Sequence, residues 1–221
     1  GLRARLETLE AQKIPYTPEE LALFRPPSLT ASKPDPKAAK KGSHELPGGA
    51  APLLAEAERA FESRRFDEAE KKYLQVLRLD DKNVLTLANL AASQLEQNRM
   101  AEAEANVKKA LAQEPTDAYS LSLLGILKFR QEKFDDALDA LSRSAQLDPR
   151  DPKTQNYLGI TLSQKGQRGA AETALRRAIQ LAPNYGGAHH NLAVIYATQQ
   201  PPFTELARWH YQKALASGHP Q

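Results

Sequence analysis

The chain has 221 residues and a formal net charge of +3, and its length fits one long domain or two short ones. Charged residues make up 26% of it with both signs interspersed, so this balance does not indicate nucleic-acid binding. Aromatic residues make up only 6%, so the core must consist mainly of alanine and leucine, which favours packed helices over sheets.

The N-terminal part carries two short amphipathic segments. Leu2, Leu6 and Leu9 recur at spacings of four and three, which predicts either the tail of a coiled coil lying upstream or a single amphipathic helix. Residues 16–24, which begin with Tyr16 and end with Phe24, contain a capping-box pattern and predict a short helix. Because the chain does not begin with Met, we expect the native N-terminus, with any signal or anchor, to be missing.

A linker is predicted next, over residues 25–49, so that residues 1–24 form a separate helical segment. The stretch 25–52 holds six prolines and three glycines and includes a basic run at residues 33–41. Because it has almost no apolar content, it cannot bury enough surface to become ordered. We therefore expect a flexible tether.

From residue 50 onward the sequence repeats every 34 residues. Small residues recur at Ala57, Ala91, Gly125, Gly159 and Ala193, and further series of alanines and prolines keep the same spacing. Apolar residues within each unit follow a helical period, which predicts five hairpins of two helices each. The predicted units are residues 50–83, 84–117, 118–151, 152–185 and 186–221.

The turn between the third and fourth units has helix-boundary chemistry. Pro149 is expected to stop one helix, Asp151 to cap the next through its carboxylate, and Pro152 to occupy the first helical position. Within the third hairpin, Gly125 is expected to face Ala137, because two helices approach closely only where a side chain is nearly absent.

The fifth unit is longer than the others because residues 199–203 extend its internal turn, which moves its signature alanine to Ala207. We interpret this extension as a surface insertion, with a contact loop as the alternative. Trp209, Tyr211 and Leu215 lie on the last predicted helix, and a terminal repeat leaves a face uncovered. Further chain or a second molecule is therefore expected to cover it, which makes self-association through this repeat a hypothesis.

The repeat resembles the tetratricopeptide repeat over residues 50–221, roughly three quarters of the chain, and its style resembles that of bacterial proteins. The family signature is a leucine, a small residue, an alanine and a proline. In this chain it reads Leu124, Gly125, Ala137 and Pro149, then Leu158, Gly159, Ala171 and Pro183. The resemblance implies an all-α, right-handed superhelical solenoid in which the first helix of each pair lines a concave groove.

No catalytic, cofactor or metal site is predicted. The absence of cysteine excludes disulfides and thiol catalysis, and no glycine-rich phosphate loop is present. His189 and His190 are adjacent, so on a helix they point about 100° apart and cannot share one metal ion. We expect His189 to pack in the fifth hairpin and His190 to face the groove.

The resemblance implies a groove that is largely apolar and aromatic and that suits an amphipathic helix or an extended apolar segment. A lysine and asparagine clamp for a peptide carboxylate is disfavoured, because only Asn89 matches it. The predicted groove residues are Leu85, Asn89, Ala92, Tyr119, Ser122, Ile126, Phe129, Lys153, Asn156, Tyr157, Ile160, His190, Asn191 and Val194.

The leading functional hypothesis is a non-catalytic scaffold that binds a protein or peptide partner. The alternatives are the substrate-presenting arm of a multidomain enzyme such as a glycosyltransferase and a structural subunit of a cell-envelope assembly. A related hypothesis is that residues 16–24 occupy the groove of their own chain. No apolar run is long enough for a membrane span. The compartment stays open between the bacterial cell envelope or periplasm and the cytoplasm.

Overall fold

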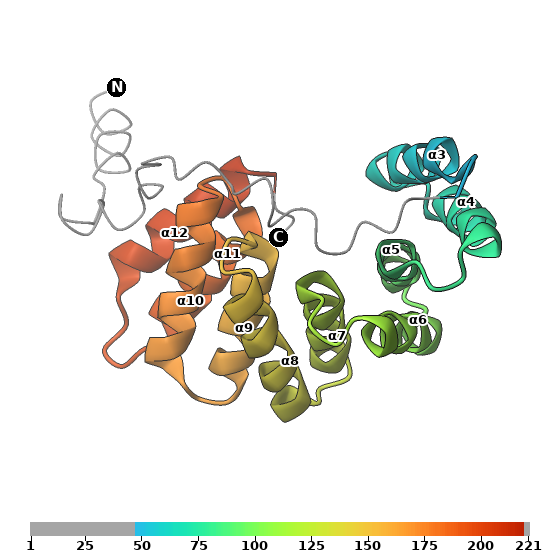
Figure 1. The fold of residues 1–221 in the computed structure, drawn as a ribbon. Coiled ribbons are helices and arrows are strands. Elements are labelled where there is room, and N and C mark those ends of the chain that lie inside the picture. The colour runs from blue at the N-terminus through green and yellow to red at the C-terminus, as the bar shows by residue number, and fades with distance from the viewer. Residues whose placement is uncertain (1–46, 219–221) are drawn as a thin grey trace, which may run out of the picture. The chain divides into compact units, whose positions relative to one another are not determined.

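The computed structural model describes residues 47–218, which form ten α-helices and no strand (Figure 1). This confirms the all-α fold of about five helical hairpins for the described residues, and the expectations for residues 1–46 lie outside them. The helices are α3 (Ala50–Glu62), α4 (Phe66–Leu79), α5 (Val84–Glu96), α6 (Met100–Gln113), α7 (Ala118–Arg130), α8 (Phe134–Leu147), α9 (Pro152–Gln164), α10 (Arg168–Leu181), α11 (Gly186–Thr198) and α12 (Thr204–Ala216).

The chain divides into two compact units, whose described parts are residues 47–149 and 150–218. The N-terminal unit contains the three hairpins from α3 to α8, and the C-terminal unit contains the two hairpins from α9 to α12. Within each unit, the second helix of one hairpin packs against the first helix of the next, as α4 does on α5 and α10 on α11. A hairpin thus buries its apolar side against its neighbour.

The first helices α5, α7 and α9 begin with the same cap. The side-chain oxygens of Asn83, Asp117 and Asp151 accept the backbone N–H three residues further on, at 3.0, 2.7 and 3.0 Å. These bonds satisfy donors that a helix N-terminus otherwise leaves unpaired. The predicted cap at Asp151 and the predicted position of Pro152 at the start of α9 are confirmed.

The three-residue turn inside each of the first four hairpins needs one left-handed residue. Arg64, Asn98, Glu132 and Gly166 occupy this position, with φ angles of 58°, 61°, 60° and 73°. Only glycine adopts this conformation without steric cost. The other three residues therefore hold a strained backbone at equivalent positions.

We expect Glu132→Gly to raise the free energy of unfolding by about 0.5–1 kcal/mol, because removing the left-handed strain outweighs the added freedom of the unfolded chain. Urea unfolding followed by circular dichroism measures this change. Lys133→Gly is the control, because Lys133 has a φ of −87° and gains nothing from glycine. A loss of stability in Glu132→Gly would contradict the strain argument.

Close helix contact inside the hairpins depends on glycine. A Cβ atom added at Gly125 would lie 2.4 Å from Cγ of Leu141, and one at Gly159 would lie 2.6 Å from Cγ of Leu175. The close approach is as expected. The side chain nearest to Gly125 is, however, that of Leu141, which lies one helical turn after the expected Ala137. The leucine fills the space that the absent side chain leaves.

A glutamate on three of the second helices connects neighbouring hairpins. In each case it accepts a hydrogen bond from a side chain 24 residues further along the chain. The pairs are Gln94 Nε2 with Glu70 at 3.1 Å, Lys128 Nζ with Glu104 at 2.9 Å, and Tyr196 Oη with Glu172 at 2.8 Å. The equivalent positions of the remaining repeat hold Leu138 and Leu162, and the division into two units, after Pro149, falls between them.

The fifth hairpin has the longer turn that its sequence predicts. Helix α11 ends at Thr198 and α12 begins at Thr204. Phe203 in this turn is 50% exposed, and its ring lies edge-on to Tyr196 with the centroids 6.2 Å apart. Ala207 is buried in α12, as a signature alanine should be.

Candidate partner-binding surfaces

The first helices of the N-terminal unit carry exposed apolar side chains. Leu85 on α5 is 49% exposed and Tyr119 on α7 is 40% exposed, and the two are 34 residues apart. Asn89 and Phe129 on the same helices are half-buried. We call this set the first-helix surface of the N-terminal unit. It combines apolar side chains with an amide that can form hydrogen bonds.

Three other predicted groove residues of α5 and α7 are not open. Ala92, Ser122 and Ile126 are only 5%, 3% and 1% exposed. Helices α5 and α7 pack against each other, and small or apolar residues are what such packing requires. This corrects the expected exposure of the three side chains, and their role in binding stays a prediction.

The first helices of the C-terminal unit present a second surface of this kind. Lys153 is exposed and Val194 is 48% exposed. Four more predicted residues are half-buried, namely Tyr157, Ile160, His190 and Asn191. We call these six residues the first-helix surface of the C-terminal unit.

Asn156 lies in the interior of the C-terminal unit. It is 5% exposed, and its Oδ1 accepts a hydrogen bond of 2.9 Å from Nδ2 of Asn191. Burial raises the pKa of the nearby Tyr185 to about 12, and a hydrogen bond with Asn156 acts against that rise. Asn156 therefore connects α9 to α11, and the expectation that it is open to a partner is corrected.

A small apolar pocket of about 370 Å³ lies between α11 and α12. His190 and Val194 line it from α11, and Arg208 and Tyr211 line it from α12. Tyr211 is 40% exposed, in agreement with an uncovered face on the last helix. Trp209, by contrast, is half-buried and packs edge-on to His189 and His210 with centroids 5.8 and 4.8 Å away.

Within residues 47–218 no cluster of three or more His, Asp or Glu side chains has the geometry of a metal site. None of the helices in that range has the length and apolar character of a membrane span.

Two family models, both described as tetratricopeptide repeat, match residues 60–127 and 122–186 and together cover more than half of the chain. The chain belongs to the tetratricopeptide-repeat (TPR) family. No match is found among curated proteins.

Several solved TPR structures resemble the chain. A crystal structure of MamA is 24% identical with a TM-score of 0.58, over 73% of this chain and 94% of that one. MamA from Desulfovibrio magneticus RS-1 is 16% identical with a TM-score of 0.61, over 80% and 98%. YrrB, described as a TPR protein with an unusual peptide-binding site, is 21% identical with a TM-score of 0.55, over 76% and 86%. At these identities the likeness shows the fold alone.

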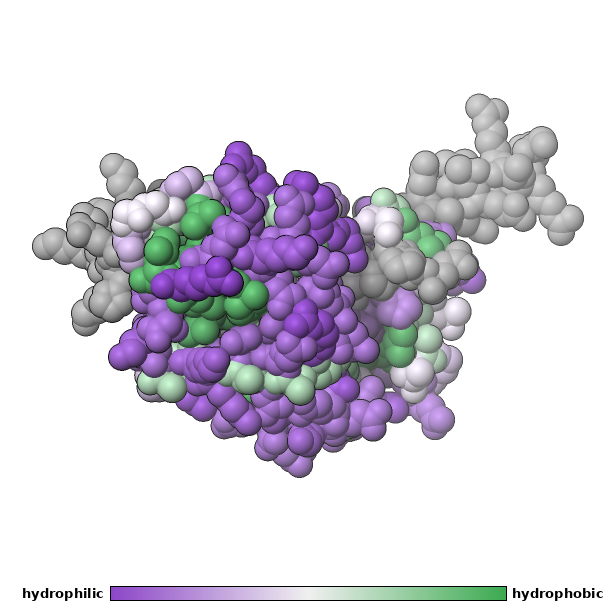
Figure 2. Space-filling view, turned by 90° about the vertical axis from the view of Figure 1, so that its right-hand side faces the viewer, coloured by the Kyte–Doolittle hydropathy of each residue, from purple (hydrophilic) through white to green (hydrophobic). Residues whose placement is uncertain are grey.

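The second TPR helices of the N-terminal unit form a groove that the repeat pattern did not predict. It has a volume of about 770 Å³, with α4 and α6 as its walls and α5 as its floor. Leu87 and Leu90 of the floor are buried, whereas Leu74 of the α4 wall is 43% exposed. We call it the second-helix groove. Figure 2, taken from the side of α3 to α6, shows a hydrophobic area that hydrophilic side chains border and partly cover.

The sequence did contain a signal for this groove. The positions equivalent to Leu74 in the next three TPR units hold Lys108, Ser142 and Arg176, so Leu74 is the apolar exception among the four. The family resemblance implies a groove lined by first helices, so Leu74, on a second helix, is not among the predicted groove residues.

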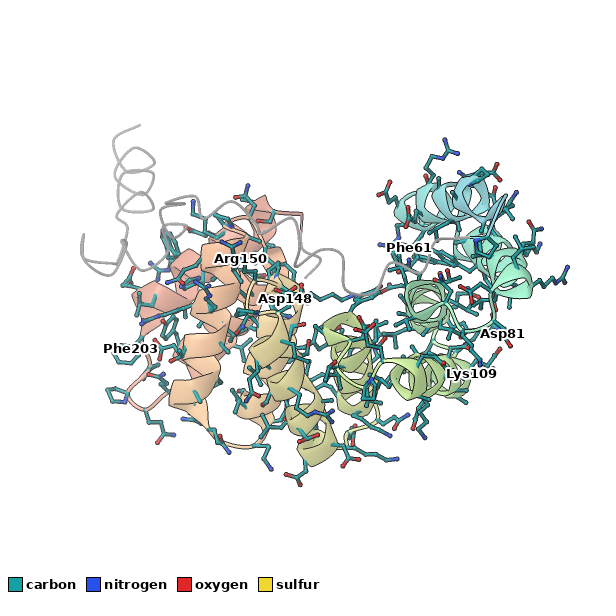
Figure 3. The ribbon with its side chains drawn as sticks, in the orientation of Figure 1. Phe61, Asp81, Lys109, Asp148, Arg150 and Phe203 are labelled. Atoms are coloured by element: carbon teal, nitrogen blue, oxygen red, sulfur yellow. The ribbon has the colours of Figure 1, made fainter. Side chains whose placement is uncertain are left out.

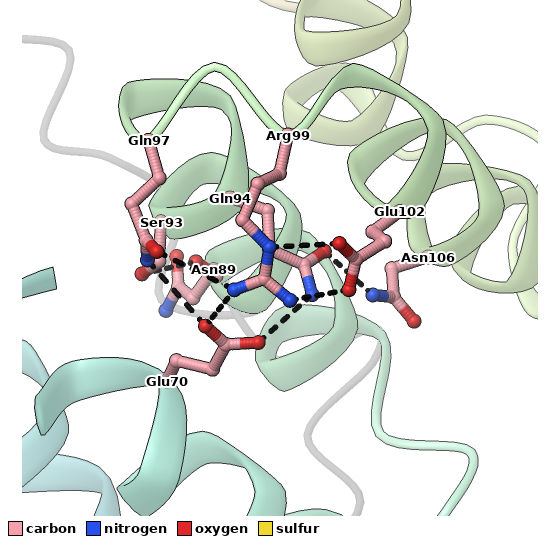
Figure 4. Close-up of polar contacts among 8 residues, drawn as sticks. All are labelled: Glu70, Asn89, Ser93, Gln94, Gln97, Arg99, Glu102 and Asn106. Carbon is pink, nitrogen blue, oxygen red and sulfur yellow. Dashed lines mark hydrogen bonds and ion pairs between the residues drawn. The ribbon is translucent and has the colours of Figure 1, made fainter. Parts of the chain in front are cut away.

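One end of the second-helix groove is closed by a charged network (Figure 4). The Arg99 guanidinium donates to the carboxylates of Glu70 and Glu102, and Asn106 Nδ2 donates to Gln94 Oε1 at 2.8 Å. The hydrogen bond from Arg99 lowers the pKa of Glu102. Two carboxylates face one guanidinium here, so this end carries a negative formal charge.

The other end of the groove is cationic. Asp81 lies there near Lys109 of α6 (Figure 3), together with Arg78 and Lys82. The ion pairs formed among the described residues include none of the three cations Arg78, Lys82 and Lys109. With one carboxylate against three cations, this end favours an acidic ligand.

The last TPR hairpin contains a buried pair of histidines. His189 and His210 are 2% and 0% exposed, and their Nδ1 atoms are 2.7 Å apart. Nε2 of His189 lies 3.1 Å from the carbonyl oxygen of Pro183, which can only accept, so Nε2 carries a proton. In the neutral pair, His210 Nδ1–H therefore donates to His189 Nδ1.

Burial disfavours a charge on this pair. It lowers the pKa of His189, and it lowers that of His210 to about 2, where His189 and Arg176 act in the same direction. The expectation that His189 packs in the fifth hairpin is confirmed. Its partner was not identified from the sequence, because His210 lies 21 residues away across the irregular turn.

Proposed function

We propose that this TPR chain is a non-catalytic scaffold that binds a helix or an extended apolar segment of a partner protein on its first-helix surfaces. The observation that carries the proposal is the exposure of Leu85 and Tyr119 at equivalent positions of two consecutive hairpins, 49% and 40% respectively. Helices α5 and α7 pack against each other, and neighbouring exposed apolar side chains typically mark an interaction surface.

The spacing of these two residues suits a regular peptide. First helices that pack together lie about 8–10 Å apart. Side chains at positions i and i+7 of a ligand helix are about 10 Å apart along its axis, and those at i and i+3 of an extended segment are about as far apart. Leu85 and Tyr119 can therefore contact two successive anchors of one ligand, with Asn89 beside them for a hydrogen bond.

The surface of the C-terminal unit supports the same proposal independently. Val194 is 48% exposed and shares the pocket between α11 and α12 with His190 and Tyr211. Pockets of a few hundred cubic ångströms accept single large side chains of a ligand. YrrB, described as having an unusual peptide-binding site, shares the fold, and this agrees with a peptide or protein as the ligand class.

The test is affinity capture with the full chain, compared with the double variant Leu85→Ala and Tyr119→Ala. We expect the affinity of the double variant for a captured partner to be at least about tenfold lower, because anchor residues commonly contribute about 2 kcal/mol or more to binding. The matched control is Leu79→Ala with Leu147→Ala, since these leucines on second helices are also 49% and 48% exposed. Equal loss in both double variants, or in neither, contradicts binding at the first-helix surface.

A further inference from the structure

We propose that the second-helix groove binds the chain's own N-terminal apolar segment, residues 16–24. This inference goes beyond the binding of a partner at the first-helix surfaces and does not depend on it, because the groove lies on second helices. The sequence suggested that this segment occupies the first-helix groove of its own chain, and the proposal moves it to the second-helix groove.

The apolar part of the groove fits this segment. Leu74 is 43% exposed on the wall, and Leu87 and Leu90 form a floor that is 3% and 2% exposed. The segment contains Leu21, Leu23 and Phe24 within four residues. Covering Leu74 with these side chains removes apolar surface from water, at about 25 cal/mol for each Å².

The dimensions agree as well. The α4 wall runs from Glu70 to Arg78, a length of about 12 Å at the helical rise of 1.5 Å per residue. Nine residues in a helix span about 13 Å, so the segment fits between the closed end and the cationic end. The groove volume of about 770 Å³ is within the range of sites that enclose several side chains.

The charges give the segment a direction. Glu19 and Glu20 precede its apolar residues, and Arg78, Lys82 and Lys109 surround the open end of the groove beside Asp81. Among the described residues that line the opposite end, the cation is Arg99, and Glu70 and Glu102 hold it. The two glutamates therefore belong at the Lys109 end, with Phe24 directed toward Leu74.

The linker between the segment and the groove is long enough to reach the groove and short enough to keep the segment near it. The 22 residues from 25 to 46 separate the segment from residue 47, which leads into α3 of the same unit as the groove. A tether of this length has an average span of about 26 Å. It supplies an effective concentration of about a millimolar, so that even weak intrinsic affinity gives substantial occupancy.

The test uses the absence of cysteine from the sequence, because the two introduced thiols are then the only thiols of the chain. The full chain carrying Leu23→Cys and Leu74→Cys is equilibrated in glutathione buffers, and the effective concentration of the two thiols is measured. The control carries Leu23→Cys and Leu85→Cys, because Leu85 is similarly exposed but lies on the first-helix surface. We expect an effective concentration at least about tenfold higher for the Leu74 pair.

Adding Glu19→Lys and Glu20→Lys should reduce this advantage by about tenfold at low salt and by less at high salt. Leu74 and Leu85 are both exposed positions of the described fold, and circular dichroism checks that the fold is kept. Equal effective concentrations for the two pairs, a higher value for the Leu85 pair, or disulfide-linked dimers in place of monomers would each overturn the proposal. Equal values or dimers leave capture of a partner by Leu85 and Tyr119 unaffected, whereas a higher value for the Leu85 pair would place the segment on the first-helix surface.

Discussion

Replacing Gly125 with valine should lower the free energy of unfolding by about 3 kcal/mol or more. A Cβ atom alone would lie 2.4 Å from Cγ of Leu141 and 3.2 Å from its backbone nitrogen. Leu141 is fully buried, so it cannot move aside, and overfilling a packed core costs about 1–3 kcal/mol before the two extra methyl groups are counted. A gain in helix propensity of less than 1 kcal/mol does not offset this cost.

Urea unfolding followed by circular dichroism measures the effect. Gly169→Ala is the control, because this glycine lies in α10 with no atom within 4 Å of the added Cβ, and it should be neutral or slightly stabilising. Combining Gly125→Ala with Leu141→Ala should cost less than the sum of the single changes, because the smaller residue makes room for the Cβ. Additive costs would show that the contact with Leu141 is not the cause.

Lowering the pH from 7.5 to 5 should destabilise the fifth hairpin by about 2 kcal/mol for each histidine that stays neutral in the fold. The pKa of His210 is lowered to about 2 by burial, and that of His189 is lowered as well. The unfolded chain therefore takes up protons below about pH 6.5 while the folded chain does not. Stability is complete above that pH and falls as the pH decreases.

The charged groups around the histidine pair do not reverse this loss of stability at low pH. Lys213 and Arg176 are cations and add to the depression of the pKa, and Glu172 is paired with Arg176 and Tyr196. Carboxylates with a lowered pKa affect stability only at a lower pH than the histidines do. Hydrogen bonds from Lys108, Gln131 and Lys128 hold the pKa of Glu104 at about 2, so its contribution is lost only below about pH 4.5.

Trp209 is the only tryptophan of the chain and packs against both histidines, so its fluorescence in urea reports this hairpin. In His210→Asn, whose amide can replace the Nδ1 donor, we expect the decrease in stability between pH 7.5 and 5 to be about half as large, whatever the absolute stability. His190→Asn is the control, because the His190 side chain is only half-buried. An unchanged pH profile in His210→Asn would rule out the buried pair as its source.

The hairpins could be predicted from the sequence because the features that form them recur with one period. Small residues at the helix contact and the caps at Asn83, Asp117 and Asp151 follow the 34-residue spacing. Each feature acts over one or two turns of helix. Local chemistry therefore decided these elements.

The exposure of the first-helix residues could not be predicted in the same way. Ile126 and Leu85 are both apolar and both on first helices, yet one is 1% and the other 49% exposed. An apolar residue on such a helix either packs between hairpins or faces outward, and periodicity does not distinguish the two. The contact between His189 and His210 likewise depends on how an irregular turn brings α12 onto α11.

Leu74 distinguishes its TPR unit from the other units of the chain. Averaging the four aligned positions would place a hydrophilic residue there, as in α6, α8 and α10. Such an idealised version would keep every cap and every glycine contact and would still form its hairpins. It would also fill the channel between α4 and α6 with a solvated side chain, so consensus engineering would preserve the architecture of this protein while erasing what sets its first two modules apart.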